Sequence, residues 1–147
     1  MERRLGIDIG RVIIEGDQPG ADTSFIGGSI EDALATPAIA GAFEAIRRLV
    51  ALFGGRVWLV SKCGARVEQK TRLWLAHHRF FEQTGVAEAN VRFCRERPQK
   101  RDHAVALGLT HFIDDRRDVL GHLEGAVEHR VLFGNWRDAE AEVRASL

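Results

Sequence analysis

Four polar residues stand where the surrounding sequence indicates the end of a strand or the start of a helix. Asp8, Ser61 and Asp114 each follow a short apolar run, and Lys100 opens a helical segment. Two carboxylates can hold Mg²⁺, which prefers oxygen ligands, and a lysine ammonium and a serine hydroxyl can bind phosphate oxygens. An aspartate carboxylate can also attack phosphorus to form an aspartyl-phosphate. Together the four residues indicate phosphoryl chemistry.

These side chains can act together only if parallel strands carry them to one edge of a sheet. Short apolar runs predict five strands, and apolar residues at helical spacing separate them. This alternation predicts an α/β fold, a three-layer Rossmann-like arrangement with helices on both faces of a parallel sheet. Ligands gather beyond the carboxyl ends of such strands, so the four residues are expected at one edge. The expected strands are 5–7, 57–60, 90–94, 110–113 and 130–133, and the expected helices are 36–53, 65–78, 99–107, 116–123 and a charged last helix.

Residues 16–36 are rich in glycine, aspartate, serine and proline, so we expect an irregular flap there and no large cap. Thr36 and Pro37 then suit the start of a helix, because threonine is a good N-cap and proline fits the first helical position. The glycines at 54 and 55 are expected to end that helix.

The composition is that of a globular protein. The 147 residues fit a single domain over 1–147, and 45% hydrophobic with 29% charged residues is a globular balance. Basic and acidic residues number 21 each, so no overall charge indicates nucleic acid or an anionic membrane surface. Two cysteines make no disulfide framework, and the first apolar run is too short for a signal segment or a membrane span. We therefore expect a cytoplasmic protein.

The order of these elements resembles the haloacid dehalogenase superfamily of phosphatases. Residues 5–14 look like its first motif, an apolar strand followed by Asp-x-Asp-Gly-Thr/Val, and residues 57–61 look like the second, an apolar strand ending in Ser or Thr. Lys100 stands where the lysine of the third motif would be. Residues 112–116, Phe-Ile-Asp-Asp-Arg, look like the acidic fourth motif, in the form found in capless nucleotidases and polynucleotide phosphatases. The resemblance spans residues 4–133.

The resemblance implies a magnesium site. Asp8 would be both the nucleophile and a metal ligand, and the backbone carbonyl of Gly10 would also bind the metal. Asp114 would complete the site directly or through water, with Asp115 or Asp118 in support.

The resemblance also implies a phosphate site. Ser61 and Lys100 would hold the phosphoryl oxygens, and Lys62 either adds positive charge beside them or is simply solvated. The substrate would be a phosphorylated small molecule or a nucleotide-like compound. A nucleic acid remains a possible partner, although the net charge does not indicate one.

One departure from the first motif concerns catalysis. Its second aspartate, which in typical phosphatases of this superfamily is the general acid and base, is Gly10 here. Losing such a group costs roughly 10²–10⁴ in rate. Gly10 keeps a carbonyl for the metal but cannot deliver a proton. Glu15 and Asp17, on the expected flap, are candidates for supplying it.

Three functions therefore stay open. The first is a magnesium-dependent phosphohydrolase acting through an aspartyl-phosphate on Asp8. The second, suggested by Gly10, is a non-catalytic phosphate- or nucleotide-binding module on the same fold. The third, a dehalogenase or phosphonatase, ranks last, because no cap offers a Schiff-base lysine and Asp114 with Asp115 looks metal-binding. Taken singly, each residue also fits a structural role as a turn, cap or solvated residue.

Overall fold

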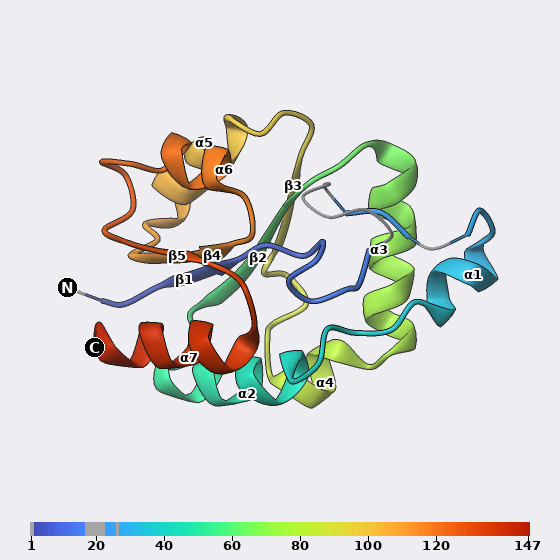
Figure 1. The fold of residues 1–147 in the computed structure, drawn as a ribbon, viewed down its shortest axis with the longest axis horizontal. Coiled ribbons are helices and arrows are strands. Elements are labelled where there is room, and N and C mark those ends of the chain that lie inside the picture. The colour runs from blue at the N-terminus through green and yellow to red at the C-terminus, as the bar shows by residue number, and fades with distance from the viewer. Residues whose placement is uncertain (1, 17–22, 26) are drawn as a thin grey trace.

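The computed structural model describes residues 2–16, 23–25 and 27–147, and its strands form a single five-stranded sheet (Figure 1). The order is β3-β2-β1-β4-β5, and every neighbouring pair is parallel. The α/β fold class predicted from the sequence is confirmed. The strands are β1 (Leu5–Ile7), β2 (Val57–Lys62), β3 (Val91–Cys94), β4 (His111–Asp114) and β5 (His129–Leu132).

Helices cover both faces of this sheet (Figure 1). On one face lie α5 and α6, and on the other lie α2, α4 and α7, while α3 contacts both α1 and α4. No helix within the described ranges combines the length and the apolar character needed to cross a membrane. The helices are α1 (Ile30–Ala35), α2 (Ala42–Leu52), α3 (Ala65–His77), α4 (Phe80–Thr84), α5 (Gln99–Leu107), α6 (Arg117–His122) and α7 (Trp136–Ala145).

The central strand, β1, is short and buried along its whole length. Leu5 and Ile7 are fully buried between the helical layers. Between them, a Cβ at Gly6 would lie 2.6 Å from atoms of both Leu109 and Phe112. Glycine is therefore needed at position 6 for the layer above β1 to pack closely against the strand.

The last helix is tied to the turn that follows β1. The side chain of Asn135 caps α7 by accepting a hydrogen bond of 2.8 Å from the backbone N–H of Asp138. The next residue, Trp136, is buried and donates its indole N–H to the carbonyl of Val12 at 2.7 Å. The position of this turn, which lies just beyond Asp8, therefore depends on α7.

The predicted helix start at Thr36 and Pro37 is wrong. Thr36 instead ends α1, where its hydroxyl donates to the carbonyl of Asp32 at 3.2 Å. Residues 37–39 then run alongside 13–15, with backbone hydrogen bonds of 3.0 Å to Pro37 O and 2.8 Å from Ile39 N. This pairing holds the chain extended, so α2 begins only at Ala42.

Two short helices were not expected from the sequence. The segment 16–36, expected to be irregular, contains α1 at its end, and Ser29 and Asp32 form a capping box there. Residues 17–22 and 26 of the expected flap lie outside the described residues. The second, α4, follows α3 after Arg79, which adopts a left-handed conformation (φ 55°).

Candidate metal and phosphate site

Two aspartates lie side by side because β1 and β4 are neighbours in register. Ile7 pairs with Ile113, so Asp8, just past β1, stands level with Asp114 at the end of β4. The backbone N–H of Asp8 donates to the carbonyl of Ile113 at 3.0 Å. Both carboxylates are buried, and Asp114 is fully so.

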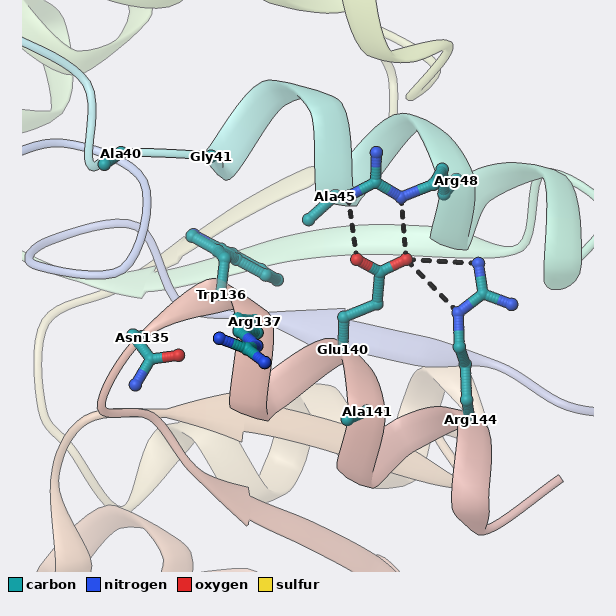
Figure 2. A pocket seen from close by; sticks show the side chains of 10 residues that line it. All are labelled: Ala40, Gly41, Ala45, Arg48, Asn135, Trp136, Arg137, Glu140, Ala141 and Arg144. Atoms are coloured by element: carbon teal, nitrogen blue, oxygen red, sulfur yellow. Dashed lines mark hydrogen bonds and ion pairs between the residues drawn. The ribbon is translucent and has the colours of Figure 1, made fainter.

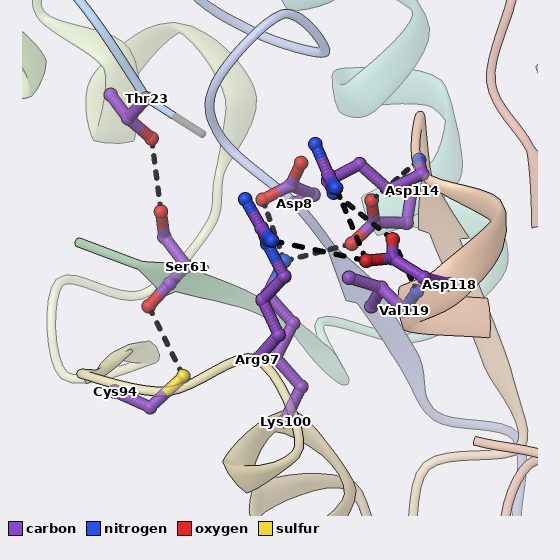
Figure 3. A network of polar contacts seen from close by, with 10 residues as sticks. Asp8, Thr23, Ser61, Cys94, Arg97, Lys100, Asp114, Asp118 and Val119 are labelled. Carbon is purple, nitrogen blue, oxygen red and sulfur yellow. Dashed lines mark hydrogen bonds and ion pairs between the residues drawn. The ribbon is translucent and has the colours of Figure 1, made fainter. Parts of the chain in front are cut away.

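Lys100, in the first turn of α5, joins the two carboxylates (Figure 3). Its ammonium donates to Asp8 Oδ1 at 3.0 Å and to Asp114 Oδ2 at 2.8 Å, and only 2% of its side chain is exposed. Burial opposes the charge on Lys100, but the two carboxylates outweigh it and raise its pKa above the usual value. The lysine is therefore a buried cation between two acids.

Asp115 adds a third carboxylate to this group. One ligand oxygen each from Asp8, Asp114 and Asp115 lies within 4.8 Å of the other two. Asp115 Oδ1 is buried and has no hydrogen-bond partner among the described residues. A buried acceptor without a partner is costly unless something outside the chain satisfies it.

The charge balance of this cluster also favours a cation. If all three carboxylates are ionised, the single ammonium leaves two negative charges uncompensated. Burial, together with the negative charge of its neighbours, raises the pKa of Asp8 to about 6 and that of Asp114 to about 7. Burial and Asp114 also raise the pKa of Asp115. A small divalent ion with a preference for oxygen ligands fits both the donor set and the charge.

Asp118, which was expected as one of two residues that support the metal site, binds an arginine instead. Asp115, and not Asp118, belongs to the metal-competent group. Asp118 instead accepts two hydrogen bonds from the guanidinium of Arg116, at 3.0 and 3.1 Å. The backbone N–H of Arg116 in turn donates to Asp114 Oδ1 at 2.9 Å. Asp118 therefore helps to fix the turn that orients Asp114.

Ser61, near the end of β2, is buried on the strand that flanks β1 opposite β4. Its hydroxyl lies 3.1 Å from the hydroxyl of Thr23, as Figure 3 shows. Thr23 was not among the residues singled out from the sequence. A lone threonine in a segment rich in small polar residues carries no signal of its own.

Gly10 packs directly against Thr23. A Cβ at position 10 would lie 2.4 Å from Thr23 Cα, 2.5 Å from its backbone nitrogen and 2.7 Å from Oγ1. Any side chain at position 10 would therefore displace the Thr23 backbone. Packing in this structure therefore requires glycine at position 10, where the first motif has its second aspartate. The metal contact expected of the Gly10 carbonyl stays a prediction.

Three described residues remain to be placed: Lys62 and Glu15, which were considered from the sequence, and Cys63, whose thiol lies just beyond β2. Lys62 is the last residue of β2 and is partly buried. Its role in phosphate binding stays a prediction. Burial and the charge of Glu68 raise the pKa of the Cys63 thiol to about 11, which argues against an activated nucleophile. Of the two expected proton donors, Glu15 is exposed and Asp17 lies outside the described residues.

A hollow of about 710 Å³ lies away from this site, between α2 and α7 (Figure 2). Its main polar group, Glu140, accepts bidentate hydrogen bonds of 2.8 Å from Arg48 and further bonds from Arg144. Since one carboxylate of α7 binds Arg48 of α2 and Arg144 of its own helix, we interpret the group as an interhelical clamp.

No protein-family model matches the chain, and no curated protein matches it in sequence. The structure shows a five-stranded parallel α/β fold with three clustered carboxylates that could hold a metal ion.

Proposed function

We propose that the chain is a magnesium-dependent phosphohydrolase of the capless haloacid dehalogenase type, with Asp8 as the nucleophile. The observation that carries the proposal is the cluster of three carboxylates around one buried lysine, with an unpartnered oxygen on Asp115. The first and fourth motifs of the sequence support the same assignment. The proposed substrate is a phosphorylated small molecule or nucleotide-like compound, and the proposed location is the cytoplasm.

In this proposal Asp8, Asp114 and Asp115 would hold Mg²⁺, which would neutralise charge on the phosphoryl group. Lys100 favours the ionised form of Asp8 and fixes its orientation through the 3.0 Å bond to Oδ1, and Asp8 Oδ2 would be the oxygen that attacks phosphorus. The hydroxyl of Ser61 can donate to a phosphoryl oxygen after giving up its bond with Thr23. Lys62, at the same strand end, would add positive charge.

The test is a screen of phosphate esters and anhydrides with the purified protein, with Mg²⁺ and with EDTA. We expect magnesium-dependent phosphate release that Asp8→Asn abolishes. Asp102→Asn, an exposed acid on α5 outside the cluster, is the matched control and should keep full activity. Turnover that survives in Asp8→Asn would contradict the assignment of the nucleophile.

A second candidate function is a phosphate-binding module without turnover. The observation that favours it is the contact between Gly10 and Thr23, which leaves no room for the usual acid and base. This candidate predicts that Mg²⁺ and inorganic phosphate raise the melting temperature while no substrate is consumed. Turnover that depends on Asp8 would dismiss it.

A further inference from the structure

Two features of this site bear on the chemistry of the group that leaves phosphorus. The first is the surroundings of Gly10. The atoms nearest to its Cβ position all belong to Thr23, and the hydroxyl of Thr23 is paired with that of Ser61. These hydroxyls can donate hydrogen bonds, but they are too weakly acidic to protonate a leaving group. Among the residues that the structure describes, this side of the site therefore offers only weak acids, which suits a leaving group that departs as a stable anion.

The second feature is a pair of arginines beside the carboxylates. Arg97 precedes α5 by two residues, and Figure 3 shows its side chain in the same polar network as Asp118. Its guanidinium lies 3.9 Å from Asp118, which Arg116 also binds through two hydrogen bonds. The guanidinium groups of both arginines thus lie beside the half-exposed carboxylate of Asp118. Guanidinium groups suit phosphate oxygens as well as carboxylates, so a phosphate can take this place.

From these features, and resting on the proposed function, we propose that the substrate is a phosphoanhydride whose leaving group is itself a phosphate held by Arg97 and Arg116. Asp8 Oδ2 forms a bond to the terminal phosphorus, and the bond from that phosphorus to the bridging oxygen breaks. The electron pair stays on the bridging oxygen, which leaves as part of an anionic phosphate and needs no proton.

The second step regenerates the enzyme. A water oxygen bonds to phosphorus, the bond between phosphorus and the Asp8 oxygen breaks, and its electron pair returns to the carboxylate. Both protons of the water leave on the released dihydrogen phosphate. No general acid enters either step, in keeping with the glycine at position 10.

The first test compares donors that differ in leaving group. Phosphate release is measured in Mg²⁺ from inorganic pyrophosphate, acetyl phosphate and glycerol 3-phosphate. Because a general acid contributes about 10²–10⁴ in rate, we expect kcat/KM for pyrophosphate to exceed that for glycerol 3-phosphate by at least about 10². Equal rates on these two would overturn the inference, as would a clear preference for acetyl phosphate. If no donor is turned over in a manner dependent on Asp8, the proposed function itself fails.

The second test addresses the arginines. Arg97→Met and Arg116→Met should lower kcat/KM for pyrophosphate at least about ten-fold more than for p-nitrophenyl phosphate, whose leaving group carries no phosphate. Arg116→Lys keeps the positive charge at this position. In both Arg116 variants the backbone N–H of residue 116 can still donate to Asp114. Arg47→Met, on the exposed side of α2, is the control and should change neither rate. Equal losses on both substrates would refute the role of the arginines.

Discussion

Replacing Lys100 by methionine removes the cation from the acidic cluster while keeping a side chain of similar length. The lysine bonds to Asp8 at 3.0 Å and Asp114 at 2.8 Å, and all three side chains are almost completely buried. Removing one partner of a buried ion pair costs about 3–5 kcal/mol, because a charge is left without compensation. Stability of a domain is typically about 5–15 kcal/mol in total, so we expect Lys100→Met to lose a large share of it.

The assay is denaturant unfolding followed by circular dichroism, in EDTA and in excess Mg²⁺. In EDTA the midpoint should fall by an amount equivalent to about 3–5 kcal/mol. Magnesium should stabilise the variant more than the native protein, because the three carboxylates then carry no internal cation. Lys70→Met is the control, since within the described part of the chain Lys70 makes only an exposed hydrogen bond, to the carbonyl of Gly28, and its loss should stay within about 0.5 kcal/mol.

A double variant separates ion pairing from simple packing. Asp114→Asn removes one of the acids that Lys100 compensates, so Lys100→Met and Asp114→Asn should together cost clearly less than the sum of the two single changes. Additive losses would refute the view that Lys100 serves to neutralise the cluster. So would a Lys100→Met protein that unfolds within about 1 kcal/mol of the native one.

Three further predictions concern packing and charge. Gly10→Ala should lower stability by about 1–3 kcal/mol, because its Cβ meets the Thr23 backbone, and an unchanged unfolding midpoint would contradict that contact. Glu140→Ala should lower the melting temperature through the lost charged hydrogen bonds to Arg48, and a melting temperature equal to that of the native protein would refute the clamp. Burial lowers the pKa of His111 from the ordinary 6.5 to about 4, so the unfolded chain takes up a proton first as the pH falls. The contribution of His111 to stability should therefore fall between pH 6.5 and about 4, by up to ~1.4 kcal/mol per pH unit, against the opposite contributions of Asp8 and Asp114, whose pKa values are raised. It is measured as the difference in pH slope between the native protein and His111→Gln, and equal slopes in both proteins would count against it.

The sequence predicted the strands and most helices because each carries its own periodicity and its own stop signals. Gly54 and Gly55 end α2, and Gly108 ends α5, as glycines able to adopt a left-handed conformation do. The start of α2 was mispredicted for a tertiary reason. Thr36 and Pro37 have the local chemistry of a helix start, but pairing with residues 13–15 holds this segment extended.

The candidate site divides in the same way between local and long-range causes. Asp8, Asp114 and Lys100 could be placed together because strand ends and a helix start fix them within a parallel sheet. The contact between Thr23 and Gly10 could not be predicted, because it depends on the return path of a segment with no periodicity. Asp115 joins the carboxylate cluster while Asp118 binds Arg116, and this difference depends on side-chain directions within one turn. The spacing of the residues in the sequence does not give these directions.

The hydrogen bond between Trp136 and Val12 spans 124 positions of the chain and joins the last helix to the turn beyond the first strand. The first strand is also the central one, and its neighbours β2 and β4 begin at Val57 and His111. On the ribosome, Asp8 is made 92 positions before Lys100, which binds it in the folded protein. The emerging chain therefore carries an incomplete carboxylate cluster until Asp114 and Asp115 are made, and the hydrogen bond that ties the turn beyond Asp8 to α7 forms only after Trp136.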